Sequence, residues 1–212
     1  MKTAIKTIKG IIFDFGGVLS SHLPLAAQER ISRAAGIDPE ALKPDYMRFR
    51  GEYDRGTISA AQYWKSVLTP LGIDPDVQMI GRLIEEDVRG WTHINNEMVS
   101  LIRSVRPGME KLGILSNMNV DCLRYVEENL PWLDMFDSRV FSCNVRLLKP
   151  EAPIYEYCLR SMGLEASECL FVDDSEENTG AAAKLGIHAV HFTSVSLFRE
   201  ELYETYSLGT WN

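Results

Sequence analysis

The strongest constraint on the fold of this chain is the segment IIFDFGG at residues 11–17. Its apolar start is typical of a β-strand buried on both faces, as in a parallel sheet covered by helices. The strand ends at a single carboxylate, Asp14, and two glycines follow, which allow a ligand to approach the backbone. Because α/β sheets present reactive side chains at the carboxyl ends of their strands, we expect a functional site at Asp14.

Short apolar segments bounded by turn residues predict five strands. They cover residues 10–13, 112–115, 139–142, 169–172 and 189–192. Apolar residues at helical spacing predict helices between the later strands, over residues 119–130, 151–162 and 177–185. Strands that alternate with helices predict an α/β fold, with a Rossmann-like, doubly wound parallel sheet as its core.

The interval from about residue 20 to about residue 95 contains no convincing strand. It contains helix-start signals instead, at DPE (38–40), SAAQ (59–62) and DPD (74–76), of which SAAQ is a capping box. We therefore expect an α-helical cap inserted after the first strand. The predicted division is a catalytic core formed by residues 1–19 and 96–212, with a cap formed by residues 20–95.

Composition limits the partners of this chain of 212 residues. Its formal net charge is −8, and no basic stripe offsets it. This argues against nucleic acid and anionic membrane as partners but allows a small anionic substrate. Four cysteines without metal-ligand spacing indicate free thiols, and Asp14 interrupts the first apolar segment too early for a secretion signal. We expect a cytoplasmic protein that is a monomer or a homodimer.

Polar side chains follow three other predicted strands. Ser116-Asn117 ends the second strand, Lys149 follows the third, and Asp173-Asp174 ends the fourth. The carboxyl ends of parallel strands share one edge of the sheet, so these groups should meet near Asp14. Clustered carboxylates repel one another unless a cation lies between them, and an all-oxygen ligand set favours Mg²⁺. Each motif alone is ordinary loop or helix-cap chemistry, whereas their joint occurrence in this order predicts a phosphoryl-transfer site.

The motifs FDFGGVL, LSN, KPE and FVDDSxxN occur in this order along the chain. In this set the chain resembles the haloacid dehalogenase superfamily of hydrolases, most of which are phosphatases. The resemblance covers essentially the whole chain, including the inserted helical cap. Within the superfamily, the chain is similar to the branch that contains the bacterial α-glucose-1-phosphate phosphatase.

The resemblance implies a role for each acidic residue of the site. Asp14 would be the nucleophile and a Mg²⁺ ligand. Asp174 would be a second ligand, and Asp173 would bind the metal directly or through water. The residue two positions after the nucleophile normally supplies a backbone carbonyl to the metal and a carboxylate as general acid/base. Here that residue is Gly16, which retains only the carbonyl.

The resemblance also implies the phosphate-binding residues. Ser116 and Asn117 would hold the phosphate together with the backbone at Gly17. Lys149 would stabilise both the phosphate and the nucleophile. The positive charge and hydrogen-bond donors of these residues suit the equatorial oxygens of a transferring phosphoryl group.

Loss of the acid/base at Gly16 typically costs about 10²–10⁴ in rate. We therefore expect a substrate with a good leaving group, such as a sugar 1-phosphate, or a substitute proton donor. His22, where the chain enters the cap, is the first candidate, although an exposed loop histidine is the simpler interpretation. Six cap residues are candidates for the substrate cavity: Arg48, Arg50, Tyr53, Arg55, Trp64 and Trp91.

The leading hypothesis is a Mg²⁺-dependent phosphatase that acts on a small phosphorylated metabolite through an aspartyl-phosphate. A 2-haloacid dehalogenase is an alternative, but such enzymes lack the acidic pair present here at Asp173-Asp174. A phosphomutase is disfavoured because its reaction depends more strongly on the missing acid/base. The remaining alternative is a catalytically weak module that binds a phosphorylated ligand or a protein, and only Gly16 supports it.

Overall fold

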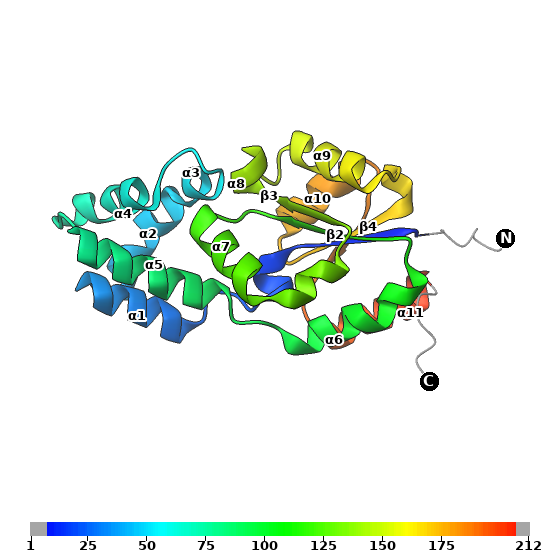
Figure 1. Cartoon of the computed structure of the whole chain (residues 1–212), viewed down its shortest axis with the longest axis horizontal. Coiled ribbons are helices and arrows are strands. Elements are labelled where there is room, and N and C mark those ends of the chain that lie inside the picture. Colours follow the sequence, from blue (N-terminus) through cyan, green and yellow to red (C-terminus); the bar gives the residue numbers. More distant parts are fainter. Residues whose placement is uncertain (1–7, 207–212) are drawn as a thin grey trace.

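A five-stranded, wholly parallel sheet forms the centre of the computed structural model, which describes residues 8–206 (Figure 1). The strand order is β3-β2-β1-β4-β5. The strands are β1 (Gly10–Phe13), β2 (Lys111–Ser116), β3 (Ser138–Phe141), β4 (Cys169–Asp173) and β5 (His188–His191). All five predicted strands are confirmed, with ends shifted by at most one residue.

Helices cover both faces of the sheet (Figure 1). Ile11 and Phe13 of β1 face one hydrophobic cluster, whereas Ile12 faces the other. The first cluster includes residues of α6 (Asn96–Val105), α7 (Val120–Asn129) and α11 (Val195–Tyr206). The second includes residues of α9 (Ala152–Met162) and α10 (Glu176–Lys184), and the short α8 (Ser142–Val145) follows β3. This alternation along β1 confirms the doubly wound α/β fold.

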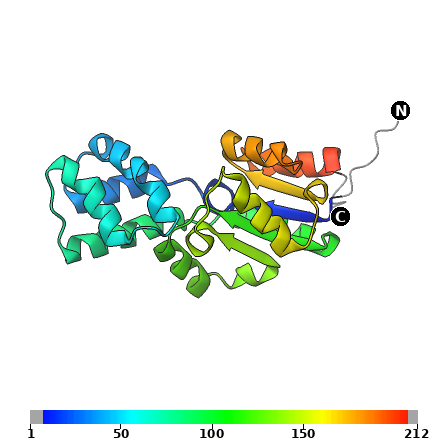
Figure 2. The same ribbon diagram turned by 90° about the horizontal axis from the view of Figure 1, so that it is seen from above.

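Five helices form the cap at one end of the sheet (Figures 1 and 2). They are α1 (Leu25–Ala35), α2 (Pro39–Arg48), α3 (Arg50–Asp54), α4 (Ala60–Leu68) and α5 (Val77–Trp91). They pack around their own hydrophobic cluster, which contains the fully buried Tyr63 and Trp64. The Ser59–Gln62 capping box is present with both of its hydrogen bonds, so the predicted start of α4 is confirmed. The domain limits drawn from the sequence stay a prediction.

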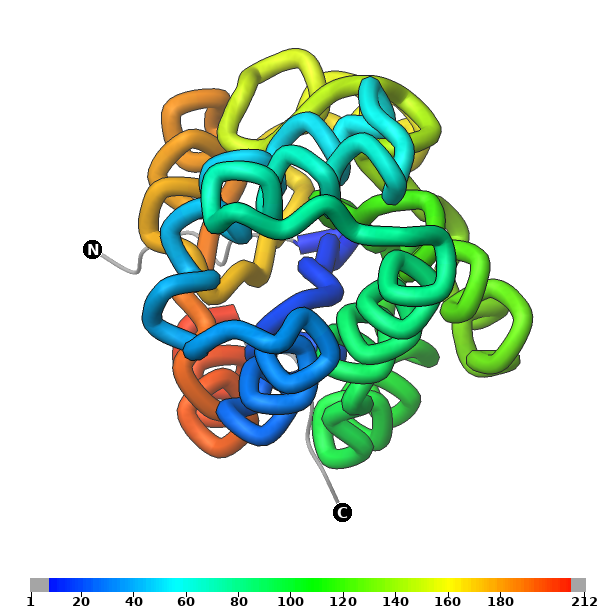
Figure 3. The backbone as a smooth tube through the Cα atoms, turned by 90° about the vertical axis from the view of Figure 1, so that its left-hand side faces the viewer, coloured from blue at the N-terminus to red at the C-terminus, as the bar shows by residue number. Residues whose placement is uncertain are grey.

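Two chain segments connect the cap to the core, and they lie side by side. The Ser21 N–H donates to the His93 carbonyl over 2.9 Å, and the Asn95 N–H donates to the Leu19 carbonyl over 2.9 Å. Ser20 and Ile94 form an isolated antiparallel bridge between them. Figure 3, seen from the cap end, shows the chain that follows β1, in dark blue, near the centre of the molecule. The carboxyl edge of the sheet therefore faces the cap.

The described helices include none that is both long and apolar enough to cross a lipid bilayer. All four cysteines are free, and Cys122, Cys158 and Cys169 are buried.

Candidate active site

Asp14 lies directly after β1, where its backbone is fixed by the neighbouring strand. Its N–H donates to the Val172 carbonyl over 2.9 Å. Its Oδ1 accepts the Phe15 N–H over 2.7 Å and lies 2.8 Å from Lys149 Nζ. Because these polar contacts within the described residues all involve Oδ1, Oδ2 is the oxygen left for a ligand. Burial raises the pKa of the Asp14 carboxyl to about 7, although the nearby Lys149 ammonium opposes the rise.

Lys149 lies beneath the acidic residues and is 4% exposed. Its Nζ contacts Asp14 Oδ1 over 2.8 Å and Asp173 Oδ2 over 2.6 Å. Burial alone would lower the pKa of the ammonium, but the two carboxylates raise it above its ordinary value. Lys149 is therefore a fixed positive charge behind Asp14.

The carboxylates of Asp14, Asp173 and Asp174 converge at this edge of the sheet. Each offers one oxygen, and these oxygens lie within 4.8 Å of one another. Burial, followed by the charge of Asp173, raises the pKa of Asp174. Three mutually repelling oxygen ligands fit a divalent cation, and Mg²⁺ prefers such ligands. These residues would hold the metal, with the Gly16 carbonyl as a further candidate ligand.

Asp173 is held more tightly than the other two carboxylates. Its Oδ1 accepts the Ser175 N–H over 2.8 Å, and Asn178 Nδ2 donates to both carboxylate oxygens over 3.0 and 3.1 Å. Lys149 occupies Oδ2 as well. These contacts favour a role for Asp173 in orienting Lys149, together with indirect binding of the metal through water.

Gly17 cannot be replaced without strain, for two independent reasons. Its φ of +77° lies in the left-handed region, and a Cβ built on it would lie 2.5 Å from the Asp174 carboxylate. The backbone of Gly17 therefore passes directly against one candidate metal ligand. This close approach places the Gly17 backbone at the edge of the site, and its role in phosphate binding stays a prediction.

Ser116 and Asn117 follow β2 beside this acidic cluster. Ser116 is buried and lines the same cavity as Asp14. The Asn117 side chain binds the backbone of Lys149, since Nδ2 donates to its carbonyl over 3.0 Å and Oδ1 accepts its N–H over 2.9 Å. The Asn117 side chain thus fixes the loop that carries Lys149. The sequence had indicated only a phosphate-binding role for it.

Gly16 faces the cap, and Trp91 lies next to it. A Cβ built on Gly16 would meet the six-membered ring of Trp91 at 3.5 Å, which is ordinary van der Waals contact. The φ of Gly16 is −68°, a value open to any residue. Neither sterics nor backbone geometry therefore requires glycine at this position.

His22 lies at the entrance to the cap, and its side chain is 74% exposed. Its Nδ1 is 3.3 Å from Asp174 Oδ2. The imidazole is therefore both solvent-accessible, as expected of an exposed loop histidine, and adjacent to the acidic cluster. Its role as a proton donor stays a prediction.

A cavity of about 330 Å³ lies between the core and the cap, and we call it the site cavity. From the core it is lined by Asp14, Gly16, Ser116, Asn117 and Asp174, among others. From the cap it is lined by His22, Met47, Arg50, Asp54, Trp91 and Thr92.

Two of the six cap residues considered in the sequence line this cavity, namely Arg50 and Trp91. Tyr53 and Trp64 are buried in the cap cluster. Arg48 is largely exposed, and Arg55 forms an ion pair with Glu151. Arginine and tryptophan occur both inside and outside the lining of this cavity, so residue type alone does not identify the lining residues.

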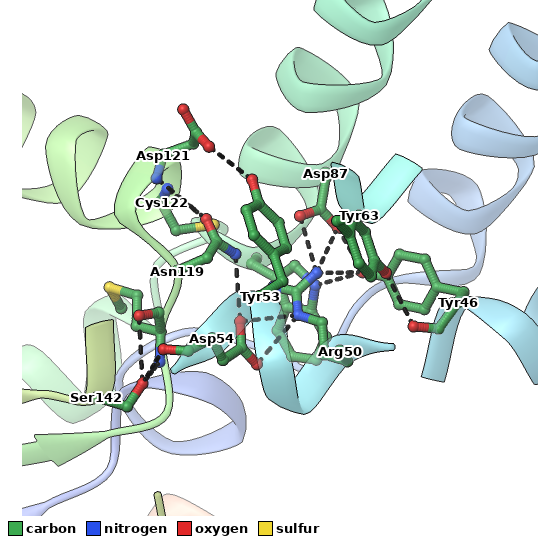
Figure 4. Close-up of polar contacts among 12 residues, drawn as sticks. Tyr46, Arg50, Tyr53, Asp54, Tyr63, Asp87, Asn119, Asp121, Cys122 and Ser142 are labelled. Carbon is green, nitrogen blue, oxygen red and sulfur yellow. Dashed lines mark hydrogen bonds and ion pairs between the residues drawn. The ribbon is translucent and has the colours of Figure 1, made fainter. Parts of the chain in front are cut away.

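Arg50 is the centre of a buried network that sequence analysis did not find (Figure 4). Its Nε donates to both Asp54 oxygens over 3.0 and 3.1 Å, and its Nη1 donates to both Asp87 oxygens over 3.0 and 2.9 Å. Tyr46 donates its hydroxyl to Asp87 and accepts hydrogen bonds from Arg50 and Trp91. Burial raises the pKa of the Asp54 carboxyl to about 6, although Arg50 opposes the rise. The spacing of Arg50 and Asp54, four residues apart, was the only sequence signal of this network.

Residues 8–186 match the model of a hydrolase family, the haloacid dehalogenase-like hydrolases. The chain belongs to this family. Among curated proteins it is 26% identical to a D-ribitol-5-phosphate phosphatase of Bacteroides thetaiotaomicron, over 92% of this chain and 97% of that protein. It is 25% identical to the sesquiterpene phosphatase astK of Aspergillus oryzae, over 88% of this chain and 91% of that protein.

A solved structure of a HAD family enzyme from Bacteroides thetaiotaomicron, in complex with magnesium, has the same fold. It is 22% identical to this chain and has a TM-score of 0.76. The match covers 92% of this chain and 100% of that one. The chain is thus a hydrolase with phosphatases among its relatives, and its acidic cluster has the composition of a metal site.

Proposed function

We propose that this protein is a Mg²⁺-dependent phosphatase that hydrolyses a small phosphorylated metabolite through an aspartyl-phosphate. The observation that carries the proposal is the meeting of Asp14, Asp173 and Asp174 above a buried Lys149. Two carboxylates in the lining of the site cavity, with a third carboxylate and an ammonium buried behind them, suit phosphoryl transfer, which depends on positioning and on charge neutralisation.

Oδ2 of Asp14 forms a bond to phosphorus while the ester oxygen leaves with its electron pair and takes up a proton. Water then attacks the phosphorus of the acyl phosphate, which releases inorganic phosphate and regenerates the carboxylate. Lys149 balances the negative charge, and Ser116 with the backbone N–H of Asn117 donates to the phosphoryl oxygens. A bound Mg²⁺ would neutralise charge on the phosphoryl group and favour the ionised form of Asp14.

We propose His22 as the donor of the proton to the leaving group, because it lines the site cavity and lies next to Asp174. His22→Gln should then slow the hydrolysis of alkyl phosphates, whose alkoxides are poor leaving groups, by at least about 10-fold. Release of p-nitrophenol, a good leaving group, should change far less. Equal slowing of both esters, measured as kcat/KM, would remove His22 from this role.

The test of the main proposal is turnover of p-nitrophenyl phosphate with Mg²⁺ and with EDTA, in the wild type and in Asp14→Asn. We expect metal-dependent release in the wild type and none in the variant. An acid-quenched wild-type sample should contain an acyl phosphate that hydroxylamine removes. Absence of metal-dependent turnover contradicts the proposal. Metal-independent chloride release from 2-chloropropionate would indicate a dehalogenase, and phosphate binding without turnover would indicate a binding module.

The chemical nature of the substrate body, the part of the molecule that carries the phosphate, is a separate question. A sugar 1-phosphate, whose anomeric oxygen leaves easily, stays the prediction drawn from Gly16. One of the two phosphatase relatives is a D-ribitol-5-phosphate phosphatase and the other is a sesquiterpene phosphatase, so together they favour no single substrate body. A cytoplasmic location and a monomeric or homodimeric state also stay predictions.

A further inference from the structure

A second cavity, of about 220 Å³, lies within the cap, and we call it the cap cavity. Apolar side chains of α1 and α2, including Ile31, Leu42 and Met47, form most of its wall. His22, Met47 and Trp91 line both this cavity and the site cavity. The two spaces therefore adjoin, and a molecule bound at Asp14 has an apolar space next to it.

Among the polar side chains of this wall, those of Gln28 and Tyr46 are occupied by other protein groups, whereas Lys43 is exposed. Gln28 donates its side-chain amide to the Leu23 carbonyl over 3.1 Å. The Tyr46 hydroxyl is bonded to Asp87, Arg50 and Trp91, so Tyr46 offers only its ring to the cavity. A polyol or sugar would need several free donors and acceptors here, because polar groups buried without partners are costly.

The arginine in the lining of the site cavity is not available for a second anionic group. The Arg50 guanidinium donates to both oxygens of Asp54 and of Asp87. Its positive charge is therefore already opposed by two carboxylates. A carboxylate or a second phosphate placed beside this network in the site cavity would meet net negative charge.

Ser32 is the exception among the buried polar residues that line the cap cavity. It is 2% exposed, and its hydroxyl has no hydrogen-bond partner in residues 8–206. Trp64 Nε1 is the other buried side-chain atom without a partner in that range, but Trp64 lines neither of the two cavities. An unpaired hydroxyl in an apolar wall costs about 1–3 kcal/mol unless a ligand or water pairs with it.

From these observations we infer that the substrate is a phosphate monoester with a mainly apolar body that occupies the cap cavity and carries one polar atom able to pair with Ser32. This inference rests on the proposed phosphatase function, and it differs from the sugar 1-phosphate that Gly16 favours. The apolar body supplies binding energy through burial, and the polar atom sets its length.

The first test is hydrolysis of ethyl, butyl, hexyl and octyl phosphate with Mg²⁺, compared with glycerol 1-phosphate and glucose 6-phosphate, which are also esters of primary alcohols. Their alkyl leaving groups are matched, so differences report binding of the body. Burial of one methylene corresponds to at most about 4-fold, so we expect kcat/KM to rise about 2- to 4-fold per methylene until the cavity is full. A flat series, or a preference for either polar ester, overturns the inference.

The second test asks whether the alkyl chain of the substrate binds in the cap cavity. Ser32→Leu fills the cap cavity, so it should lower the ratio of octyl to ethyl phosphate kcat/KM towards one. Ser100→Leu, at an exposed serine of α6, is the matched control and should leave the ratio unchanged. Equal ratios in Ser32→Leu and the wild type contradict the inference. If Ser32→Leu does not fold, calorimetric titration of the wild type with alkylphosphonates decides: affinity must rise with chain length.

The third test concerns the polar atom. In a series of ω-hydroxyalkyl phosphates, one chain length should exceed its neighbours by about 2- to 10-fold in kcat/KM, because its hydroxyl reaches Ser32. Ser32→Ala should remove that maximum, and a maximum that persists contradicts the pairing. Turnover of p-nitrophenyl phosphate distinguishes failure of the phosphatase proposal from failure of the inference about the apolar body. If it fails, the phosphatase proposal is wrong; if it succeeds while chain length has no effect, only the apolar body is wrong.

Discussion

At the scale of single residues, Gly16 is where this site departs most from the pattern that its motifs resemble. Its backbone would accept any side chain, and a Cβ there meets Trp91 only at ordinary contact distance. Gly16→Asp should therefore fold and place a carboxylate beside the acidic cluster. In the His22→Gln background, which lacks the proposed proton donor, we expect Gly16→Asp to raise kcat/KM for alkyl phosphates by about 10-fold or more, with little change for p-nitrophenyl phosphate, because only poor leaving groups need a proton.

The matched control for this prediction is Gly16→Asn, which has the same shape but cannot transfer a proton. A gain that both variants share would indicate an effect of packing against Trp91 and not acid/base catalysis. No gain from Gly16→Asp in the His22→Gln background would contradict proton transfer by a carboxylate at this position.

The residues at strand ends were predictable because their signals are local. Apolar segments and turn residues place Asp14, Ser116 and Asp173 at the ends of parallel strands. Because these ends share one edge of the sheet, the three side chains lie close together. The actual partner of the Asn117 side chain was not predictable. It depends on how a loop thirty residues further along approaches β2, and no local pattern encodes that approach.

At the scale of elements, the network around Arg50 joins α3 and α5 of the cap to α7 of the core (Figure 4). Asp54 accepts hydrogen bonds from Arg50 and, over 3.3 Å, from Asn119, which is the N-cap of α7. Sequence periodicity predicts each helix but not which arginine will be neutralised by its neighbours. The pairing of Arg50 with Asp87 is set by the packing of α3 against α5 and is therefore a tertiary property.

This network predicts a pH dependence of stability. Burial raises the pKa of Asp54 from 3.8 to about 6, so the folded state holds that proton more tightly than the unfolded state. The contribution of Asp54 to the free energy of unfolding therefore falls as the pH rises from about 4 to about 6, by at most about 3 kcal/mol. Asp54→Asn should remove this fall. The free energy of unfolding of the variant, relative to that of the wild type, should therefore increase as the pH rises from about 4 to about 6.

Urea unfolding of both proteins at intervals between pH 4 and pH 8 measures the effect. The comparison is Asp74→Asn, which removes an exposed carboxylate outside the network. A relative stability of Asp54→Asn that does not vary with pH, or that varies in the same way for Asp74→Asn, would contradict the prediction.

At the scale of the whole molecule, the acidic cluster connects metal binding to folding. Asp14 follows β1 and Asp174 follows β4, so their repulsion acts across the centre of the sheet. A cation that binds the folded state alone stabilises it, and at 100 times its Kd the melting temperature should rise by roughly 5–10 °C. Asp174→Asn removes both a candidate ligand and a repelling charge.

Asp174→Asn should therefore melt above the wild type in EDTA and below it in excess Mg²⁺, since burial and Asp173 already raise the pKa of this carboxyl. Asp134→Asn, at an exposed aspartate of the segment before β3, is the control and should show the wild-type metal response. Thermal unfolding of the three proteins in both conditions measures the reversal. If Mg²⁺ raises the melting temperature of the wild type and of Asp174→Asn by the same amount, the cation binds elsewhere. Only the loss of a metal ligand would make the variant less stable than the wild type in Mg²⁺ but more stable in EDTA.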